Sequence, residues 1–133
     1  MELKDDHFCF VCGQQNALGL RLSFKVDAVG RTIETVFLPR KEHQGYQGIV
    51  HGGIISAVLD ECMTKLAFSL GIDAVTAKMT VRFKRPLSVG EEVTVTGRLL
   101  KEGTRAIEAE AVAVRQDGSV VAEAEGILMR VRR

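Results

Sequence analysis

The chain has 133 residues, of which 46% are hydrophobic and 26% are charged, and its formal net charge is +1. This length predicts a single domain over residues 1–133. The nearly neutral charge provides no general attraction to nucleic acid or to a membrane surface. Trp is absent and Tyr occurs once, so no aromatic platform for stacking bases is expected. We therefore expect neither nucleic acid nor a membrane as partner.

The N-terminal residues 1–6 are mostly charged and do not resemble a signal peptide. No run approaches the roughly 20 apolar residues that a membrane span needs. Three cysteines, an odd number, argue against a disulfide framework and favour a reducing compartment. These features predict a cytoplasmic protein.

Residues 1–19 are expected to form an irregular N-terminal lead-in. Apolar and polar residues then alternate over 20–26 and again over 32–38, which predicts two strands of a hairpin. Pro39 ends the second strand. Residues 40–51 are expected to form a loop that contains Gly45 and Gly48.

The next segment predicts a helix over residues 52–70, followed by Gly71 as its C-terminal glycine. Its apolar residues recur at positions 54, 58, 62, 66 and 70 and at 55, 59, 63 and 67. The two rows form one wide apolar stripe, so we expect a largely enclosed helix with Cys62 in the core.

After the helix the period is two, with strands predicted over 75–83, 92–101, 105–115 and 119–131. Gly103 and Asp117-Gly118 mark reversals between them. The predicted class is α+β, a curved antiparallel sheet wrapped around one long central helix. Long edge strands in such a sheet need protection, which favours an oligomer.

The start of the helix carries the strongest chemical signal. Gly52 and Gly53 leave backbone N–H groups bare at the helix start, where they can bind an oxyanion. Asp60 lies two turns further on, and a carboxylate on a mostly apolar helix needs a partner or a task. The alternative is structural: a tight loop-to-helix junction and a buried carboxylate without catalytic role.

His51-Gly52-Gly53, with Asp60 nine residues after the histidine, resembles the hotdog-fold acyl-CoA thioesterases, in particular the phenylacetyl-CoA-thioesterase-like branch. The resemblance covers about residues 20–131. It is supported by Gly45-Tyr46 and Gly48 upstream and by residues 79–83 and Pro86 downstream.

The resemblance implies a hotdog fold and hydrolysis of acyl-CoA to a carboxylic acid and coenzyme A, without metal or other cofactor. It assigns the carbonyl-binding amide to Gly52 or Gly53, and the general base or nucleophile to Asp60 of the partner subunit. Thr76 falls where relatives carry a hydroxyl that assists the attacking water. Gly45 stands where some relatives have an asparagine that orients the thioester or the water, and Gln47, Gln44 or His43 is expected to substitute. For His51 we favour a hydrogen-bonding role over direct chemistry.

Gly53 and Asp60 lie roughly 10 Å apart along one helix at 1.5 Å per residue, which is too far for both to contact one carbonyl. The two groups therefore serve different active sites, each completed by a neighbouring subunit. We expect a homodimer at least, and a homotetramer built as a dimer of dimers.

Coenzyme A carries phosphates, and basic side chains are expected to meet them. The candidates are Arg82, Lys84, Arg85 and Arg105. Glu61 points about 100° away from Asp60 on a helix, so we expect it to face solvent or an interface.

Cys9 and Cys12 form a Cys-x-x-Cys pair, which can bind zinc or perform redox chemistry. A closed zinc site needs four ligands and the chain has no second pair, so we expect a packing segment. Two alternative functions remain open: an acyl-CoA-binding protein without hydrolysis, and a hotdog enoyl-CoA hydratase or dehydratase.

Overall fold

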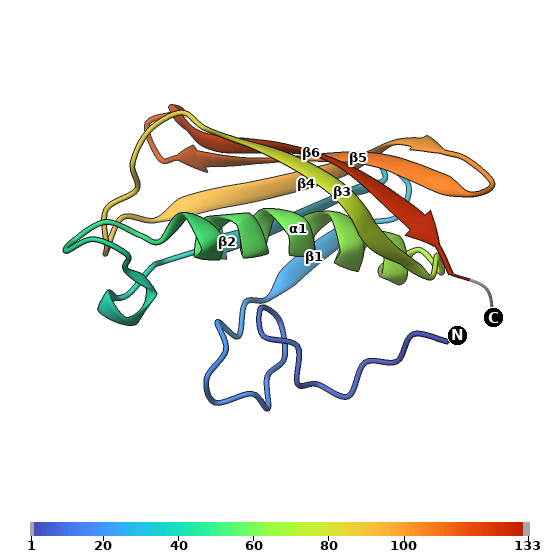
Figure 1. Cartoon of the computed structure of the whole chain (residues 1–133), viewed down its shortest axis with the longest axis horizontal. Coiled ribbons are helices and arrows are strands. Elements are labelled where there is room, and N and C mark those ends of the chain that lie inside the picture. The colour runs from blue at the N-terminus through green and yellow to red at the C-terminus, as the bar shows by residue number, and fades with distance from the viewer. Residues whose placement is uncertain (1, 132–133) are drawn as a thin grey trace.

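The computed structural model describes residues 2–131. One helix, α1 (Gly52–Ser69), lies against one face of a six-stranded antiparallel sheet, as Figure 1 shows. The strands are β1 (Phe24–Asp27), β2 (Thr32–Phe37), β3 (Ala74–Phe83), β4 (Val93–Glu102), β5 (Ala106–Arg115) and β6 (Val120–Arg130), and a short 3₁₀ helix, η1 (Lys41–His43), follows β2. This arrangement confirms the predicted hotdog fold.

The spatial order of the strands is β1-β2-β4-β5-β6-β3. The sequence places β3 directly after the helix, but in space it pairs with β6 and forms one edge of the sheet. The other edge, β1, has 4 residues, whereas β3 has 10. Within the described residues, β3 is therefore a long strand with one unpaired side.

The first strand is shorter than the alternation over residues 20–26 predicts. Arg21 has φ 53°, in the left-handed region, which interrupts an extended strand. The N–H groups of Leu20 and Leu22 donate to the carbonyls of Phe10 and Val11, at 2.8 and 2.9 Å. The start of the predicted strand thus pairs with the N-terminal lead-in, and only Phe24–Asp27 pairs with β2.

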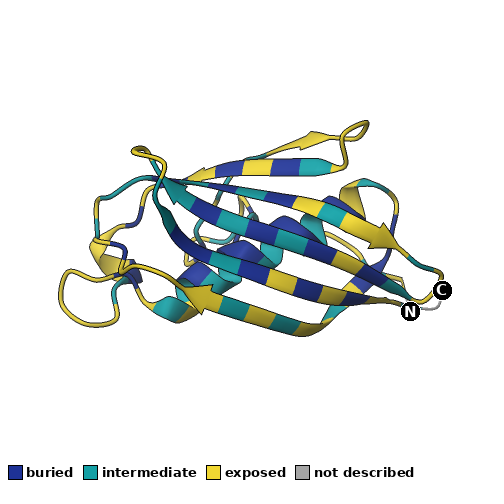
Figure 2. Ribbon diagram, turned by 90° about the horizontal axis from the view of Figure 1, so that it is seen from above, coloured by how far each residue is buried: buried dark blue, intermediate teal, exposed yellow. Residues whose placement is uncertain are grey.

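The helix ends as predicted, with Leu70 as C-cap and Gly71 at φ +80°. Its apolar stripe faces the sheet, where buried and exposed residues alternate along the strands (Figure 2). The buried helix residues are Ile55, Val58, Leu59, Cys62, Met63, Leu66 and Ala67.

Two glycines in the sheet allow the helix to approach closely. A Cβ on Gly97 of β4 would lie 3.1 Å from the Cys62 Cβ, and one on Gly126 of β6 would lie 2.8 Å from the Met63 Sδ. A Cβ at position 97 would crowd the helix at Cys62, whereas one at position 126 would require the flexible end of the Met63 side chain to move. Among the described residues, no helix is both long and apolar enough to cross a membrane.

Candidate active site

The start of α1 is fixed by the strands and loops around it. The Val50 N–H donates to the Leu87 carbonyl at 2.8 Å, and the His51 N–H donates to the His43 carbonyl at 2.9 Å. His43 is itself buried, with its ring centroid 5.5 Å from that of Phe37. The first turn of the helix therefore has a defined position relative to the sheet.

His51 is the N-cap of the helix. Its Nδ1 accepts a hydrogen bond from the Gly53 N–H at 2.8 Å, and its carbonyl accepts from Ile54 at 3.0 Å and Ile55 at 3.2 Å. The Gly53 N–H is thus already in use. The Gly52 N–H has no hydrogen-bond partner within residues 2–131, so Gly52 offers the available donor at the helix start.

An aromatic ring lies directly beside this donor. A Cβ on Gly52 would lie 3.4 and 3.5 Å from two ring atoms of Phe83, the last residue of β3. Phe83 is 53% exposed, so its ring is available for contact with a further group. The helix start therefore combines an unpaired N–H with an apolar wall.

Asp60 lies further along the same helix and contacts β3. The Thr76 hydroxyl donates to Asp60 Oδ1 at 2.5 Å. Asp60 Oδ2 accepts no hydrogen bond from the described part of the chain. The register of β3 against β6 shifts between Thr76 and Lys78, which indicates a β-bulge beside this pair. One carboxylate oxygen is thus held in place and the other is free.

Burial raises the pKa of Asp60 above the ordinary value of 3.8, the Thr76 hydrogen bond lowers it in part, and the charge of Glu61 raises it. A half-buried carboxylate with a raised pKa is a stronger base than one in water. The pair thus has the properties of a proton acceptor held by a hydroxyl.

The family model for the thioesterase superfamily matches residues 47–122, which is more than half of the chain and includes α1 and β3. The chain belongs to the thioesterase superfamily. The matched region contains His51, Gly52, Asp60 and Thr76, the residues that form the helix start and the carboxylate pair.

Two of the proteins similar to this chain are mammalian. Acyl-coenzyme A thioesterase 13 of Mus musculus is 27% identical over 99 residues, which cover 63% of this chain and 71% of that protein. Acyl-coenzyme A thioesterase THEM4 of Rattus norvegicus is 29% identical over 92 residues, which cover 69% of this chain but only 40% of that protein.

Solved structures share the fold. A thioesterase superfamily protein gives a TM-score of 0.85 at 27% identity, covering 92% of this chain and 60% of that one. The structure of a hypothetical thioesterase from Streptococcus pneumoniae with coenzyme A gives a TM-score of 0.77 at 18% identity, and the match covers 84% of this chain and 88% of that one. The E. coli PaaI protein from the phenylacetic acid degradation operon gives a TM-score of 0.77 at 20% identity, and the match covers 85% of this chain and 81% of that one.

The loop residues predicted to contact substrate lie beside the start of α1. A Cβ on Gly45 would lie 3.4 Å from the Cα and Cδ2 of His51, which is ordinary van der Waals contact. Gln47 is exposed in the same loop, whereas the Gln44 side chain accepts from the Gly48 N–H at 3.0 Å. Gly45 therefore adjoins the helix start, and Gln47 is free to reach toward solvent.

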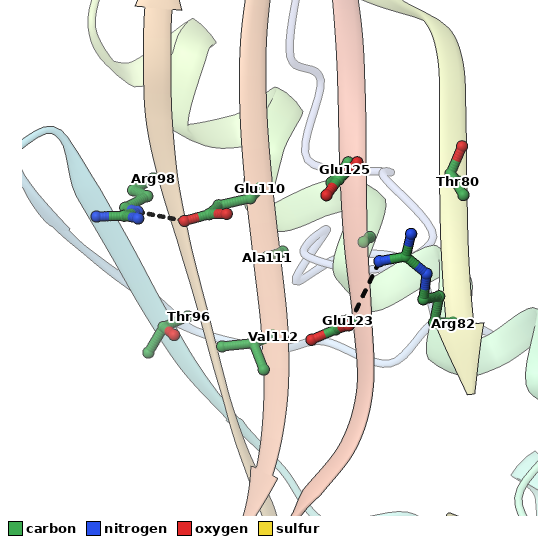
Figure 3. A pocket seen from close by; sticks show the side chains of 10 residues that line it. Thr80, Arg82, Thr96, Arg98, Glu110, Ala111, Val112, Glu123 and Glu125 are labelled. Carbon is green, nitrogen blue, oxygen red and sulfur yellow. Dashed lines mark hydrogen bonds and ion pairs between the residues drawn. The ribbon is translucent and has the colours of Figure 1, made fainter. Parts of the chain in front are cut away.

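The basic residues at the end of β3 belong mainly to the outer face of the sheet. Met79 and Val81 pack against the core, so by alternation Arg82 faces away from the helix. Arg82 and Lys84 lie 3.7 and 3.5 Å from the Glu123 carboxylate. Figure 3 shows Arg82 and Glu123 in a hollow of about 250 Å³ on this face. Within one chain, the Arg82 and Lys84 side chains are therefore on the opposite side of the sheet from Asp60.

Arg85 and Arg105 have different surroundings. The Arg85 guanidinium donates to the Val120 carbonyl at 2.6 Å, close to the end of β3 that adjoins Gly52. The Arg105 carbonyl accepts from Arg130 at 2.8 Å, at the opposite end of the sheet. Of the two, Arg85 lies closer to the helix start of its own chain.

Glu61, which we expect from its helical position to face solvent or an interface, lies against the N-terminal lead-in of its own chain. It is half-buried, and the Cys9 thiol donates to its Oε2 at 3.1 Å. Burial, together with Glu61, raises the pKa of the Cys12 thiol to about 12. The sequence did not indicate this contact, because 52 residues separate Cys9 from Glu61.

Proposed function

We propose that this chain is an acyl-CoA thioesterase whose active site is shared by two subunits. In each site, the Gly52 N–H of one subunit binds the thioester carbonyl oxygen, and Asp60 of the other acts as general base or nucleophile. The observation that carries the proposal is the Asp60–Thr76 pair, a half-buried carboxylate with one oxygen held and one free.

The chemistry follows from where charge develops. When water attacks, negative charge moves onto the carbonyl oxygen, and a fixed N–H at a helix start stabilises it, assisted by the helix dipole. Acting as base, Asp60 accepts one proton of the attacking water. The new C–O bond forms, the C–S bond breaks, and coenzyme A leaves as a thiolate that later takes up a proton. A free thiol has a pKa of about 8.5, so this leaving group needs little acid assistance.

The geometry of one chain argues for two subunits. Gly52 and Asp60 are eight residues apart on α1, about 12 Å along the axis at 1.5 Å per residue. Phe83 adjoins Gly52 near one end of β3, and Thr76 holds Asp60 near the other end. One carbonyl cannot contact both groups of a single chain.

The unpaired side of β3 offers a way to bring the groups together. If two copies pair antiparallel along β3 with a two-fold axis near Met79 and Thr80, Thr76 of one copy lies opposite Phe83 of the other. In this pairing, Asp60 of one copy lies on the same side of the dimer as Gly52 of the other copy and closer to it than to Gly52 of its own chain. It also covers the long edge strand, which is a liability in a single chain. We propose this homodimer, and a tetramer made of two such dimers.

The relatives support the proposed substrate. Two similar proteins are named acyl-coenzyme A thioesterases, and the pneumococcal structure contains coenzyme A. In that pneumococcal protein, an aspartate and a threonine 16 residues apart have each been changed to alanine in solved structures. Asp60 and Thr76 have the same separation.

Within this site, His51 positions Gly52 and Gly53 through its capping bond, and Gln47 beside Gly45 is proposed to contact the substrate or the attacking water. We further propose that the coenzyme A phosphates meet basic groups among Arg82, Lys84, Arg85 and Arg105. Arg85 of the subunit that supplies Gly52 is the first candidate, because Arg82 and Lys84 pair with Glu123 on the outer face of the sheet and Arg105 lies at the opposite end.

Incubation of the purified protein with short, medium, long and aryl acyl-CoAs in the presence of a thiol reagent tests the proposal. We expect thiol release with at least one of these substrates. Failure with all of them would overturn the assignment. A ligand-dependent rise in melting temperature without thiol release would instead indicate an acyl-CoA-binding protein.

A further inference from the structure

Cys9, Cys12 and Glu61 come together on the side of α1 that faces away from the sheet, where the N-terminal lead-in lies (Figure 1). Their candidate ligand atoms all lie within 4.8 Å of one another, and each residue is half-buried. We propose that these three side chains form a binding site for a thiophilic divalent metal ion, with Zn²⁺ as the preferred occupant. The site is separate from Gly52 and from the hydroxyl that holds Asp60.

The turn that carries the two cysteines is closely constrained. The Gly13 N–H donates to the Cys9 carbonyl at 2.8 Å, and a Cβ on Gly13 would lie 2.4 Å from Cys9 N and 2.5 Å from its carbonyl oxygen. No side chain larger than hydrogen fits there. Val11, between the cysteines, is buried in the core and anchors the turn. The backbone therefore holds both thiols near the same point without help from a metal.

The helix supplies the third ligand. Glu61 Oε2 already accepts from the Cys9 thiol at 3.1 Å, so the carboxylate points at the sulfurs. Two thiolates and a carboxylate suit Zn²⁺, which binds sulfur and oxygen donors tetrahedrally and accepts three protein ligands with a fourth position open. An adjoining cavity of about 190 Å³, lined in part by Leu3, Asp5 and Phe68, has room for a water or another small ligand at that position.

The charges of the site would balance once the ion is bound. With both thiols ionised, Cys9, Cys12 and Glu61 carry three negative charges, which the ion and one further positive charge would balance. Lys65 supplies that charge, because its Nζ lies 3.5 Å from Cys12 Sγ. Binding displaces the two thiol protons to solvent and involves no change of oxidation state.

A Cys9–Cys12 disulfide is the competing interpretation of the same pair. It would remove both sulfur ligands and the thiol donor that now pairs with the Glu61 carboxylate. A metal ion instead uses all three groups and ties the lead-in to α1. We therefore expect the ion to stabilise the folded chain, as any ligand that binds only the folded state does.

Spectroscopy of the Co²⁺-loaded protein tests the proposal without any measurement of activity. The full chain is reduced, freed of metal with a chelator and titrated with Co²⁺. We expect one ion per chain, with an ultraviolet thiolate-to-cobalt charge-transfer band and the visible bands of a tetrahedral ion. Zn²⁺ should displace Co²⁺, bleach these bands and raise the melting temperature. Reduced wild-type protein that shows no such band and no Zn²⁺-dependent rise would overturn the proposal, whatever the outcome of the thioesterase assay.

Variants then identify the ligands. Cys9→Ser and Cys12→Ser should each lose the charge-transfer band of the two-thiolate site, whereas Cys62→Ala, which removes the third thiol from the core, should keep it. Glu61→Gln should weaken metal affinity by more than the ~10- to 100-fold that loss of an outer-sphere partner costs. Unchanged affinity in Glu61→Gln, or loss of the band in a folded Cys62→Ala protein, would contradict the assignment.

Discussion

The proposed carbonyl-binding donor can be removed without removing a side chain, by Gly52→Pro. Gly52 is the first residue of α1, where proline is tolerated because its missing N–H would make no helical bond. His51 has ψ 130°, the extended conformation that the residue before a proline prefers. A Cβ at position 52 would make only ordinary contacts with Phe83, at 3.4 and 3.5 Å. The backbone before residue 52 and the space for a Cβ are thus compatible with proline.

Loss of one such donor typically costs about 100- to 1,000-fold in kcat, or about 2.7–4 kcal/mol of transition-state stabilisation. The folded protein should instead become more stable, because a compatible proline lowers the conformational entropy of the unfolded chain and so adds about 0.4–1 kcal/mol to the free energy of unfolding. We therefore expect Gly52→Pro to melt at or slightly above the wild-type temperature while losing most of its turnover with the best acyl-CoA substrate.

Gly52→Ala is the matched control, since it adds the Cβ but keeps the N–H. It should retain kcat within a few-fold of wild type. Thiol release measured at saturating substrate, together with thermal melts of all three proteins, makes the comparison. A folded Gly52→Pro protein with wild-type kcat would refute the role of this N–H, and an equal loss in Gly52→Ala would assign the effect to crowding against Phe83.

Further predictions concern the carboxylate and the cap. Asp60→Asn should lower kcat by about 10²- to 10⁴-fold, the usual contribution of a general base; near-wild-type activity would exclude Asp60 from the mechanism. The Thr76 hydrogen bond lowers the pKa of Asp60, so Thr76→Val should move the acid limb of the kcat–pH profile to higher pH, whereas Thr76→Ser should leave it in place. Because the pKa of Asp60 is higher in the folded chain, its ionisation opposes folding once the pH exceeds the ordinary value of 3.8. Asp60→Asn should therefore melt above wild type at neutral pH, and this difference should shrink as the pH falls to that value. His51→Ala should lower stability by about 1 kcal/mol through loss of the N-cap, and His51→Asn should recover most of it; equal melting temperatures for His51→Ala and wild type would argue against the cap.

The helix and four long strands were predictable because their signals are local. The wide apolar stripe of residues 54–70 determines one buried helix face, and the period-two pattern after residue 74 determines strands that each bury one side. The Asp117-Gly118 reversal likewise follows from local turn chemistry, with Gly118 at φ +89°.

Other features depend on contacts that the sequence pattern does not contain. Residues 20–22 alternate like a strand, but their N–H groups pair with residues 10 and 11 of the lead-in. The sequence does not distinguish Gly52 from Gly53, whereas in the structure the His51 ring accepts from the Gly53 N–H and leaves the Gly52 N–H free. Arg82 and Lys84 lie beside Glu123 because β3 pairs with β6, a pairing between strands that are far apart in the sequence. Each of these outcomes was decided by tertiary geometry.

The central claim, one active site made by two subunits, is tested most directly by mixing two inactive variants. Gly52→Pro and Asp60→Asn homodimers each lack one half of every site. In a mixed dimer, one site carries both defects, and the other combines an intact Gly52 from one chain with an intact Asp60 from its partner.

After denaturation and refolding together at equal amounts, half of the dimers should be mixed, and about a quarter of the wild-type activity should return. Separately refolded controls should remain inactive. Activity in the mixture no greater than the sum of the two variants alone, with exchange of subunits demonstrated by mass, would contradict the shared site.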